Sequence, residues 1–112
     1  MRVAQAIAKL DNYNPNTEIR TKNIFSVAQK VLPIDNIVGH RDGEVCVLEA
    51  GNTFVESMLI WEVLEKLKTF PRDAKLKVKY QFADELRFLD VFDINLDCTD
   101  LYFEAREKIC AA

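Results

Sequence analysis

KLKVKYQF, residues 75–82, alternates between polar and apolar side chains along its whole length. One side carries Lys75, Lys77 and Lys79, and the other carries the apolar residues Leu76, Val78, Tyr80 and Phe82. A period of two is typical of a β-strand with one side in a core and the other in water. The stretch therefore predicts a strand, and it leaves open whether the lysine row binds an anionic partner or only faces solvent.

Two β-hairpins are predicted around this strand. One hairpin is predicted to pair the strand 75–82 with residues 87–96 (RFLDVFDINL), and residues 83–85 join the two arms. Apolar residues on both sides of the arm 87–96 favour an interior strand. Residues 37–51 (IVGHRDGEVCVLEAG) predict the other hairpin, because Asp42-Gly43 is a strong turn dipeptide. The two hairpins predict a four-stranded, mainly antiparallel sheet.

Helices are predicted in four places. The clearest spans 53–70, where Thr53 and Glu56 match a capping box and Pro71 ends the pattern. Its first half is apolar all round, which indicates a central position in the fold or a covering partner. Apolar spacing predicts three further helices, over 2–13, 22–32 and 100–110.

The order α-α-β-β-α-β-β-α predicts an α+β fold in which helix 53–70 packs on the sheet and N- and C-terminal helices flank it. The last two-thirds are interpreted as two hairpin-plus-helix units that share an architecture without matching residues. With 112 residues, 49% of them hydrophobic and 29% charged, the chain is expected to form a single domain over 1–112.

The cysteine count and hydropathy predict a cytoplasmic protein that does not cross a membrane. Three cysteines is an odd number, and they lack metal-knuckle spacing, which favours reduced thiols. No signal peptide and no apolar run of about 18 residues is visible. The stretch LDNYNPNTEI (10–19) is similar to a helix-turn segment of small bacteriophage-encoded proteins. This likeness covers ten residues, implies no functional residue and suggests at most a phage or bacterial accessory protein.

Catalytic chemistry has little support in the sequence. His40 stands alone beside a turn, and Cys46 lies between valines in a strand, where a buried structural thiol is expected. Cys98 precedes the predicted helix 100–110, whose N-terminus would lower its thiol pKa. No phosphate-binding glycine motif or metal-ligand spacing is present, so no cofactor and no metal are expected.

The first functional hypothesis is a non-enzymatic protein-binding module, such as an adaptor, inhibitor or accessory regulator. Residues 84–112 hold eight acidic and three basic residues, although ion pairing with the rest of the chain is the favoured interpretation of that imbalance. If an acidic surface within 84–107 binds a basic partner, Asp84, Glu85 and Asp93 are the candidate residues.

Three alternatives stay open. Lys75, Lys77 and Lys79 would bind nucleic acid or an acidic protein, although this side of the strand lacks interleaved aromatics for base stacking. A small enzyme would use Cys98 or His40. A homodimer would cover the apolar start of helix 53–70.

Overall fold

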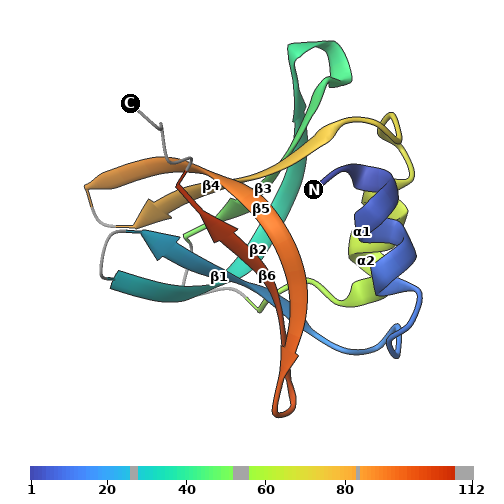
Figure 1. Cartoon of the computed structure of the whole chain (residues 1–112), viewed down its shortest axis with the longest axis horizontal. Coiled ribbons are helices and arrows are strands. Elements are labelled where there is room, and N and C mark those ends of the chain that lie inside the picture. Colours follow the sequence, from blue (N-terminus) through green and yellow to red (C-terminus); the bar gives the residue numbers. More distant parts are fainter. Residues whose placement is uncertain (26–27, 52–55, 83, 108–112) are drawn as a thin grey trace.

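The computed structural model of the protein (Figure 1) describes residues 1–25, 28–51, 56–82 and 84–107. Two short helices, α1 (Val3–Leu10) and α2 (Ile60–Leu67), lie side by side at one end of a barrel. The barrel consists of six strands: β1 (Ile19–Phe25), β2 (Ala28–His40), β3 (Val45–Ala50), β4 (Lys75–Phe82), β5 (Glu85–Asp97) and β6 (Asp100–Arg106). A 3-10 turn, η1 (Arg41–Gly43), joins β2 to β3.

The sheet closes on itself in the order β1-β2-β3-β4-β5-β6. Four neighbouring pairs are antiparallel, whereas β3 with β4 and β6 with β1 are parallel. Parallel neighbours need a crossover connection, and α2 lies in the one between β3 and β4. Closure gives every strand two neighbouring strands, and the long strands β2 and β5 divide their length between them, since β2 pairs with β1 at its start and with β3 at its end.

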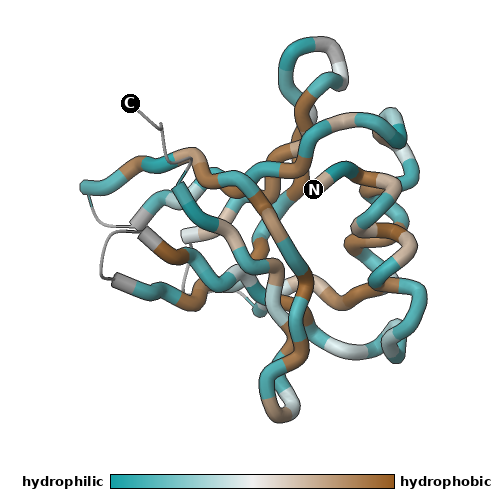
Figure 2. The backbone as a smooth tube through the Cα atoms, in the orientation of Figure 1, coloured by the Kyte–Doolittle hydropathy of each residue, from teal (hydrophilic) through white to brown (hydrophobic). Residues whose placement is uncertain are grey.

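Hydrophobic and hydrophilic residues alternate along much of the strands (Figure 2), and most of the buried side chains in the interior of the barrel are apolar. In β4 this confirms the prediction, because Leu76, Val78 and Tyr80 are buried and the lysines between them point outward. Tyr80 and Phe103 are the largest fully buried side chains. The helices close one end of this core with the buried residues Val3, Ala6 and Leu10 of α1 and Ile60, Val63 and Leu67 of α2.

The predicted α+β fold, a four-stranded sheet with a central helix and flanking helices, is wrong, because the chain forms a closed six-stranded barrel that is mostly sheet. The segment expected to be helix 22–32 instead supplies β1 and the start of β2, with residues 26–27 outside the described part. Thr21 and Asn23 are buried in β1 at a spacing of two, which is a strand period. Pairing of β1 with both β2 and β6 outweighs the local helical spacing.

The predicted C-terminal helix 100–110 is also wrong. Residues Asp100–Arg106 form β6, and the alternately spaced Leu101, Phe103 and Ala105 are its buried side chains. Leu101 and Ala105 fit a helical spacing equally well, and the need for a strand between β5 and β1 decides between the two periods. Residues 108–112 lie outside the described part.

The predicted helix 53–70 is confirmed over Ile60–Leu67, which form α2, whereas the described residues 56–59 before it are not helical. Thr53 of the expected capping box lies outside the described residues. Glu62 takes the capping role, and its Oε1 accepts a hydrogen bond from the backbone N–H of Leu59 at 3.0 Å. The predicted N-terminal helix is confirmed as the shorter α1, which Gln5 caps in the same way. Neither helix is long and apolar enough to cross a membrane.

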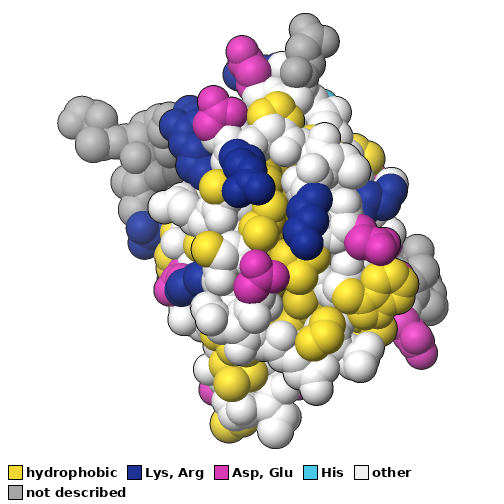
Figure 3. Space-filling view, turned by 90° about the vertical axis from the view of Figure 1, so that its right-hand side faces the viewer, with side chains coloured by type: hydrophobic (Ala, Val, Ile, Leu, Met, Phe, Trp, Pro, Cys, Tyr) yellow, Lys and Arg dark blue, Asp and Glu magenta, His cyan; other side chains and the backbone are white. Residues whose placement is uncertain are grey.

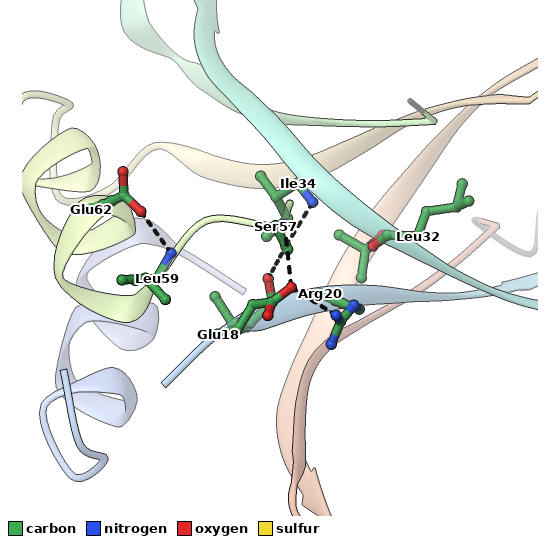
Figure 4. A network of polar contacts seen from close by, with 9 residues as sticks. Glu18, Arg20, Leu32, Ile34, Ser57, Leu59 and Glu62 are labelled. Carbon is green, nitrogen blue, oxygen red and sulfur yellow. Dashed lines mark hydrogen bonds and ion pairs between the residues drawn. The ribbon is translucent and has the colours of Figure 1, made fainter. Parts of the chain in front are cut away.

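Ser57 fastens the segment before α2 to the first two strands (Figure 4). Its hydroxyl donates a hydrogen bond to the carbonyl of Ile19 and accepts one from the backbone N–H of Ile34 at 2.9 Å. Its own backbone N–H donates to Glu18 Oε1 at 3.3 Å, and Glu18 also pairs with Arg20 at 2.7 Å. These contacts fix where the chain crosses the end of the barrel to begin α2.

The element order repeats, because a helix followed by three strands occurs twice. We name these parts unit 1 (α1-β1-β2-β3) and unit 2 (α2-β4-β5-β6). Up to the turn before the third strand, each residue of unit 1 has a counterpart 57 positions later, as Val3 and Ile60 begin their helices. The earlier interpretation of two hairpin-plus-helix units placed the boundary wrongly, because the helix begins each unit.

Gly51 follows β3 directly and lies against the backbone of β4. Its φ is +150°, and a Cβ there would lie 1.6 Å from the backbone oxygen of Gln81. Gly51→Ala is expected to destabilise the protein by about 2–4 kcal/mol, since backbone must move. Gly39→Ala is the control, because its Cβ would meet the ring of Phe70, a side chain that can shift. Equal urea midpoints for the two variants would contradict this.

Candidate docking face on the barrel surface

The predicted acidic residues lie at two separate places on β5. Asp84 and Glu85 are exposed at the turn between β4 and β5, and Glu85 pairs with Arg87 at 3.1 Å. Asp93 lies eight residues further along, so that roughly 26 Å separates it from Glu85 in an extended strand. The structure therefore does not bring the three residues together into one surface.

Several acidic residues of the segment 84–112 form ion pairs with basic residues elsewhere in the chain. Lys9 of α1 pairs with Asp93, Lys22 of β1 pairs with Asp97 at 3.9 Å, and Lys77 of β4 pairs with Asp90 at 3.2 Å. Each of these pairs joins a base from residues 1–83 to an acid from residues 84–112. The favoured interpretation of the charge imbalance, pairing within the chain, is confirmed.

The lysine row of β4 faces solvent as predicted. Lys77 pairs with its cross-strand neighbour Asp90, and Lys79 lies 3.8 Å from Glu49 of the adjacent β3. Lys75, at the start of the strand, makes no ion pair within the described residues. Two of the three charges are thus already offset, which leaves the row a weaker cationic surface than the sequence indicates.

Phe88 and Phe92 of β5 lie on the same outer surface as the lysines, and sequence reasoning missed this. A strict period of two along 87–96 places them on the same side as Ile94, which is buried, but a β-bulge between Val91 and Asp93 reverses the sides there. Phe88 is 54% exposed and stands directly opposite Lys79, and Phe92 is 36% exposed. Asp90 between them was the available signal, because an aspartate rarely points into a core.

These residues form an apolar–basic face over β4, β5 and β6, which we define by Leu86, Phe88, Phe92, Lys75, Lys77 and Arg106. Two hollows indent it on either side of Lys77. One, of about 630 Å³, includes Phe92 and Arg106 in its wall. The other, of about 320 Å³, is largely apolar and is lined by Val45, Val47 and Phe88 beside His40 and Arg41. The face offers two recesses for protruding side chains.

The charge around the two hollows is mainly positive. Within the described residues Arg41, Lys75 and Arg106 make no ion pair. The Arg106 guanidinium lies 4.6 Å from the centre of the Phe92 ring, so its charge stays available above an aromatic surface. The arrangement combines unpaired cations with exposed aromatic and aliphatic groups.

The candidate catalytic residues do not meet. His40 is exposed where β2 ends, and Cys98 is exposed in the β5–β6 turn with a φ of 56°, so no helix N-terminus lies beside its thiol. Cys46 is buried as predicted, and desolvation raises the pKa of its thiol to about 12. Among the described residues no group of three or more His, Cys, Asp or Glu side chains could hold a metal ion.

The helix side of the molecule also carries exposed apolar groups. Figure 3 shows a strip of hydrophobic side chains there, bordered by Lys, Arg, Asp and Glu. Trp61 of α2 is 43% exposed. Within the apolar stretch that was expected to drive self-association, the described residues 56–59 are not helical, and a homodimer stays a prediction.

Models of known protein families, curated protein sequences and solved structures give no match to this chain. What the face does must therefore be inferred from its geometry and chemistry.

The Lys9–Asp93 pair should make stability depend on acid pH. The hydrogen bond from Lys9 is the main cause that holds the pKa of Asp93 below its usual 3.8. Such a pair stabilises the protein above the ordinary carboxyl pKa and loses its effect as pH falls through the lowered value. Both side chains are partly exposed, so Lys9→Met should lower the free energy of unfolding at neutral pH by about 0.5–1 kcal/mol.

Urea unfolding measured from about pH 7 down to about pH 2.5 would check this, with the gap between variant and parent closing at the acid end. Lys66→Met is the matched control, because Lys66 is the counterpart of Lys9 and makes no ion pair within the described residues. A constant gap at all pH values would exclude the Asp93 pair as its cause.

Proposed function

We propose that the protein is a non-enzymatic binding module that holds an acidic protein partner on its apolar–basic face. This keeps the protein-binding hypothesis and moves the binding surface from Asp84, Glu85 and Asp93 to β4, β5 and β6. The partner accordingly changes from a basic protein to an acidic one.

The observation that carries the proposal is a difference between the two units. Leu86, Phe88 and Phe92 of β5 have the counterparts Gln29, Val31 and Asp35 on β2. Both strands are 13 residues long, and both have a β-bulge at the counterparts Asp35 and Phe92. β2 holds the position in unit 1 that β5 holds in unit 2, and it does so with a glutamine, a valine and an aspartate. The fold therefore does not require the large apolar side chains of β5. Exposed groups of this kind gather at docking surfaces.

Charge points to an acidic partner. Arg41, Lys75 and Arg106, which pair with no acid in the described part of the chain, surround the hollows, whereas the chain as a whole has a net charge of −3. An acidic segment with apolar side chains would neutralise these cations and fill the recesses beside Phe88 and Phe92. Apolar contact would then supply most of the affinity, and the cations would supply orientation and association rate.

Aliphatic side chains distinguish this proposal from nucleic-acid binding. Leu86 is 54% exposed, and Val45 and Val47 line the hollow beside Phe88. Bases stack on aromatic rings, whereas a protein partner also covers aliphatic groups. With few unpaired cations, the face suits a protein better than a polyanion.

A triple variant tests the face with residues taken from the chain's own first unit. Leu86→Gln, Phe88→Val and Phe92→Asp copy the counterparts on β2, so the barrel is expected to stay folded. In capture from nuclease-treated lysate, a protein retained by the parent should bind the triple variant at least tenfold more weakly, equivalent to about 1.4 kcal/mol.

Trp61→Ala is the matched control, because it removes the exposed aromatic of the helix side and copies the counterpart Ala4. It should retain the same protein as the parent. Loss of capture by Trp61→Ala together with full capture by the triple variant would place docking on the helix side and contradict the proposal.

One observation keeps nucleic acid as the second candidate function. Phe88 stands opposite Lys79 and Arg106 lies over Phe92, so aromatic and cationic groups are interleaved across the strands. If this hypothesis holds, a single-stranded oligonucleotide should be retarded by the parent at about 50 mM salt and released at about 200 mM. Retardation that Lys75→Gln and Arg106→Gln leave unchanged would exclude this face.

A further inference from the structure

Units 1 and 2 match in sequence as well as in element order. Over residues 1–41 and 58–98, seven counterpart pairs are identical: Met1/Met58, Lys9/Lys66, Leu10/Leu67, Lys22/Lys79, Phe25/Phe82, Leu32/Leu89 and Ile37/Ile94. Others are conservative, among them Val3/Ile60, Gln5/Glu62, Tyr13/Phe70, Ile19/Leu76 and Ile34/Val91. The interpretation that the units share no matching residues is therefore wrong, since it compared them in the wrong alignment.

Local geometry follows the same spacing. Gln5 and Glu62 each accept a hydrogen bond from the backbone N–H at the start of their helix, at 2.8 and 3.0 Å. Among the residues that the structure describes, Arg41 and Cys98 are the non-glycine residues with positive φ, at 53° and 56°. After these turns the spacing shortens to 55, because Cys46 pairs with Leu76 as Leu101 pairs with Ile19.

The contacts between the units occur in matched pairs. The N–H of Val3 donates to Ala74 O at 3.0 Å, and its counterpart Ile60 donates to Thr17 O at 2.9 Å. The first strand of each unit makes a second matched contact. The N–H of Leu76 donates to Met1 O and the N–H of its counterpart Ile19 donates to Met58 O, both at 3.0 Å. Met1 and Met58 each lie two residues before the helix of their own unit. The isolated bridges Arg2–Lys75 and Glu18–Leu59 are counterparts as well.

Reciprocal contacts of this kind define an isologous interface, in which the same surface on two subunits binds itself. The buried residues of α1 and α2 obey the rule too, because Val3, Ala6 and Leu10 are counterparts of Ile60, Val63 and Leu67. The two parallel strand pairs, β3 with β4 and β6 with β1, complete the same interface.

We propose that the chain is a fused dimer, in which the surface between the units is a self-complementary protein interface whose partner is a second copy of the αβββ unit. A single unit would expose the outer edges of β1 and β3 and the apolar side of its helix, and another unit covers all three. The residues that connect β3 to α2 then act as a tether, and the order of the units along the chain is interchangeable. This inference does not depend on the proposed docking face.

A circular permutant of the whole chain tests it. Ala112 is joined directly to Met1, and the chain is opened between Ser57 and Met58, so that unit 2 precedes unit 1. Nine residues connect Ala50 to Ile60, and the join gives the same number between their counterparts Ala105 and Val3. In a second permutant, residues 107–112 are replaced by the sequence of residues 52–57. The new connection from β6 to α1 then has the same sequence as the existing connection from β3 to α2.

At least one permutant should be a monomer with the parent's far-ultraviolet circular dichroism. It should unfold in a single urea transition with a midpoint within about 1 M of the parent. If neither permutant unfolds cooperatively, the order of the units matters and the proposal is overturned. Because the measurement is of folding, its outcome is separate from partner capture by the apolar–basic face.

Discussion

Closure of the sheet is the constraint on which the rest of this structure depends. Three antiparallel strands in each unit would leave backbone donors and acceptors unpaired at both edges, and the parallel pairs β3–β4 and β6–β1 satisfy them. A parallel pair cannot be joined by a tight turn. The chain therefore crosses the end of the barrel between β3 and β4, and α2 on that crossing packs beside α1 over the apolar core.

Because side chains fill the interior of the barrel, the candidate docking face lies on its outer surface. Tyr80, Phe103 and inward-facing residues such as Ile19, Leu48 and Ile94 pack into the barrel, so the inward side chains serve stability. The outward side chains of β2 and β5 have no such task, and there the two units diverge. β5 carries large apolar side chains where β2 has smaller or polar ones, so the fold does not require the large apolar side chains of β5.

Charged side chains divide in a comparable way between ion pairs within the chain and the proposed docking face. Lys9, Lys22 and Lys77 are held by aspartates of β5 and stabilise contacts between elements. Arg41, Lys75 and Arg106 have no such partner within the described residues, and they border the same hollows as Phe88 and Phe92. Sequence composition cannot separate these two sets, because the distinction depends on which acid lies within a few ångströms of each base.

The sequence by itself determined the local features: the strand at 75–82 with its lysines in water, the hairpins on either side of α2, the helix at the N-terminus and the buried Cys46. Each depends on neighbours a few residues away, so periodicity and turn chemistry suffice. Tertiary structure alone decided that residues 19–25 and 100–106 are strands and that Phe88 and Phe92 face solvent. The first depends on pairing between the two ends of the chain, and the second on a bulge set by the register with β6. Both are long-range contacts, which the local spacing of apolar residues does not encode.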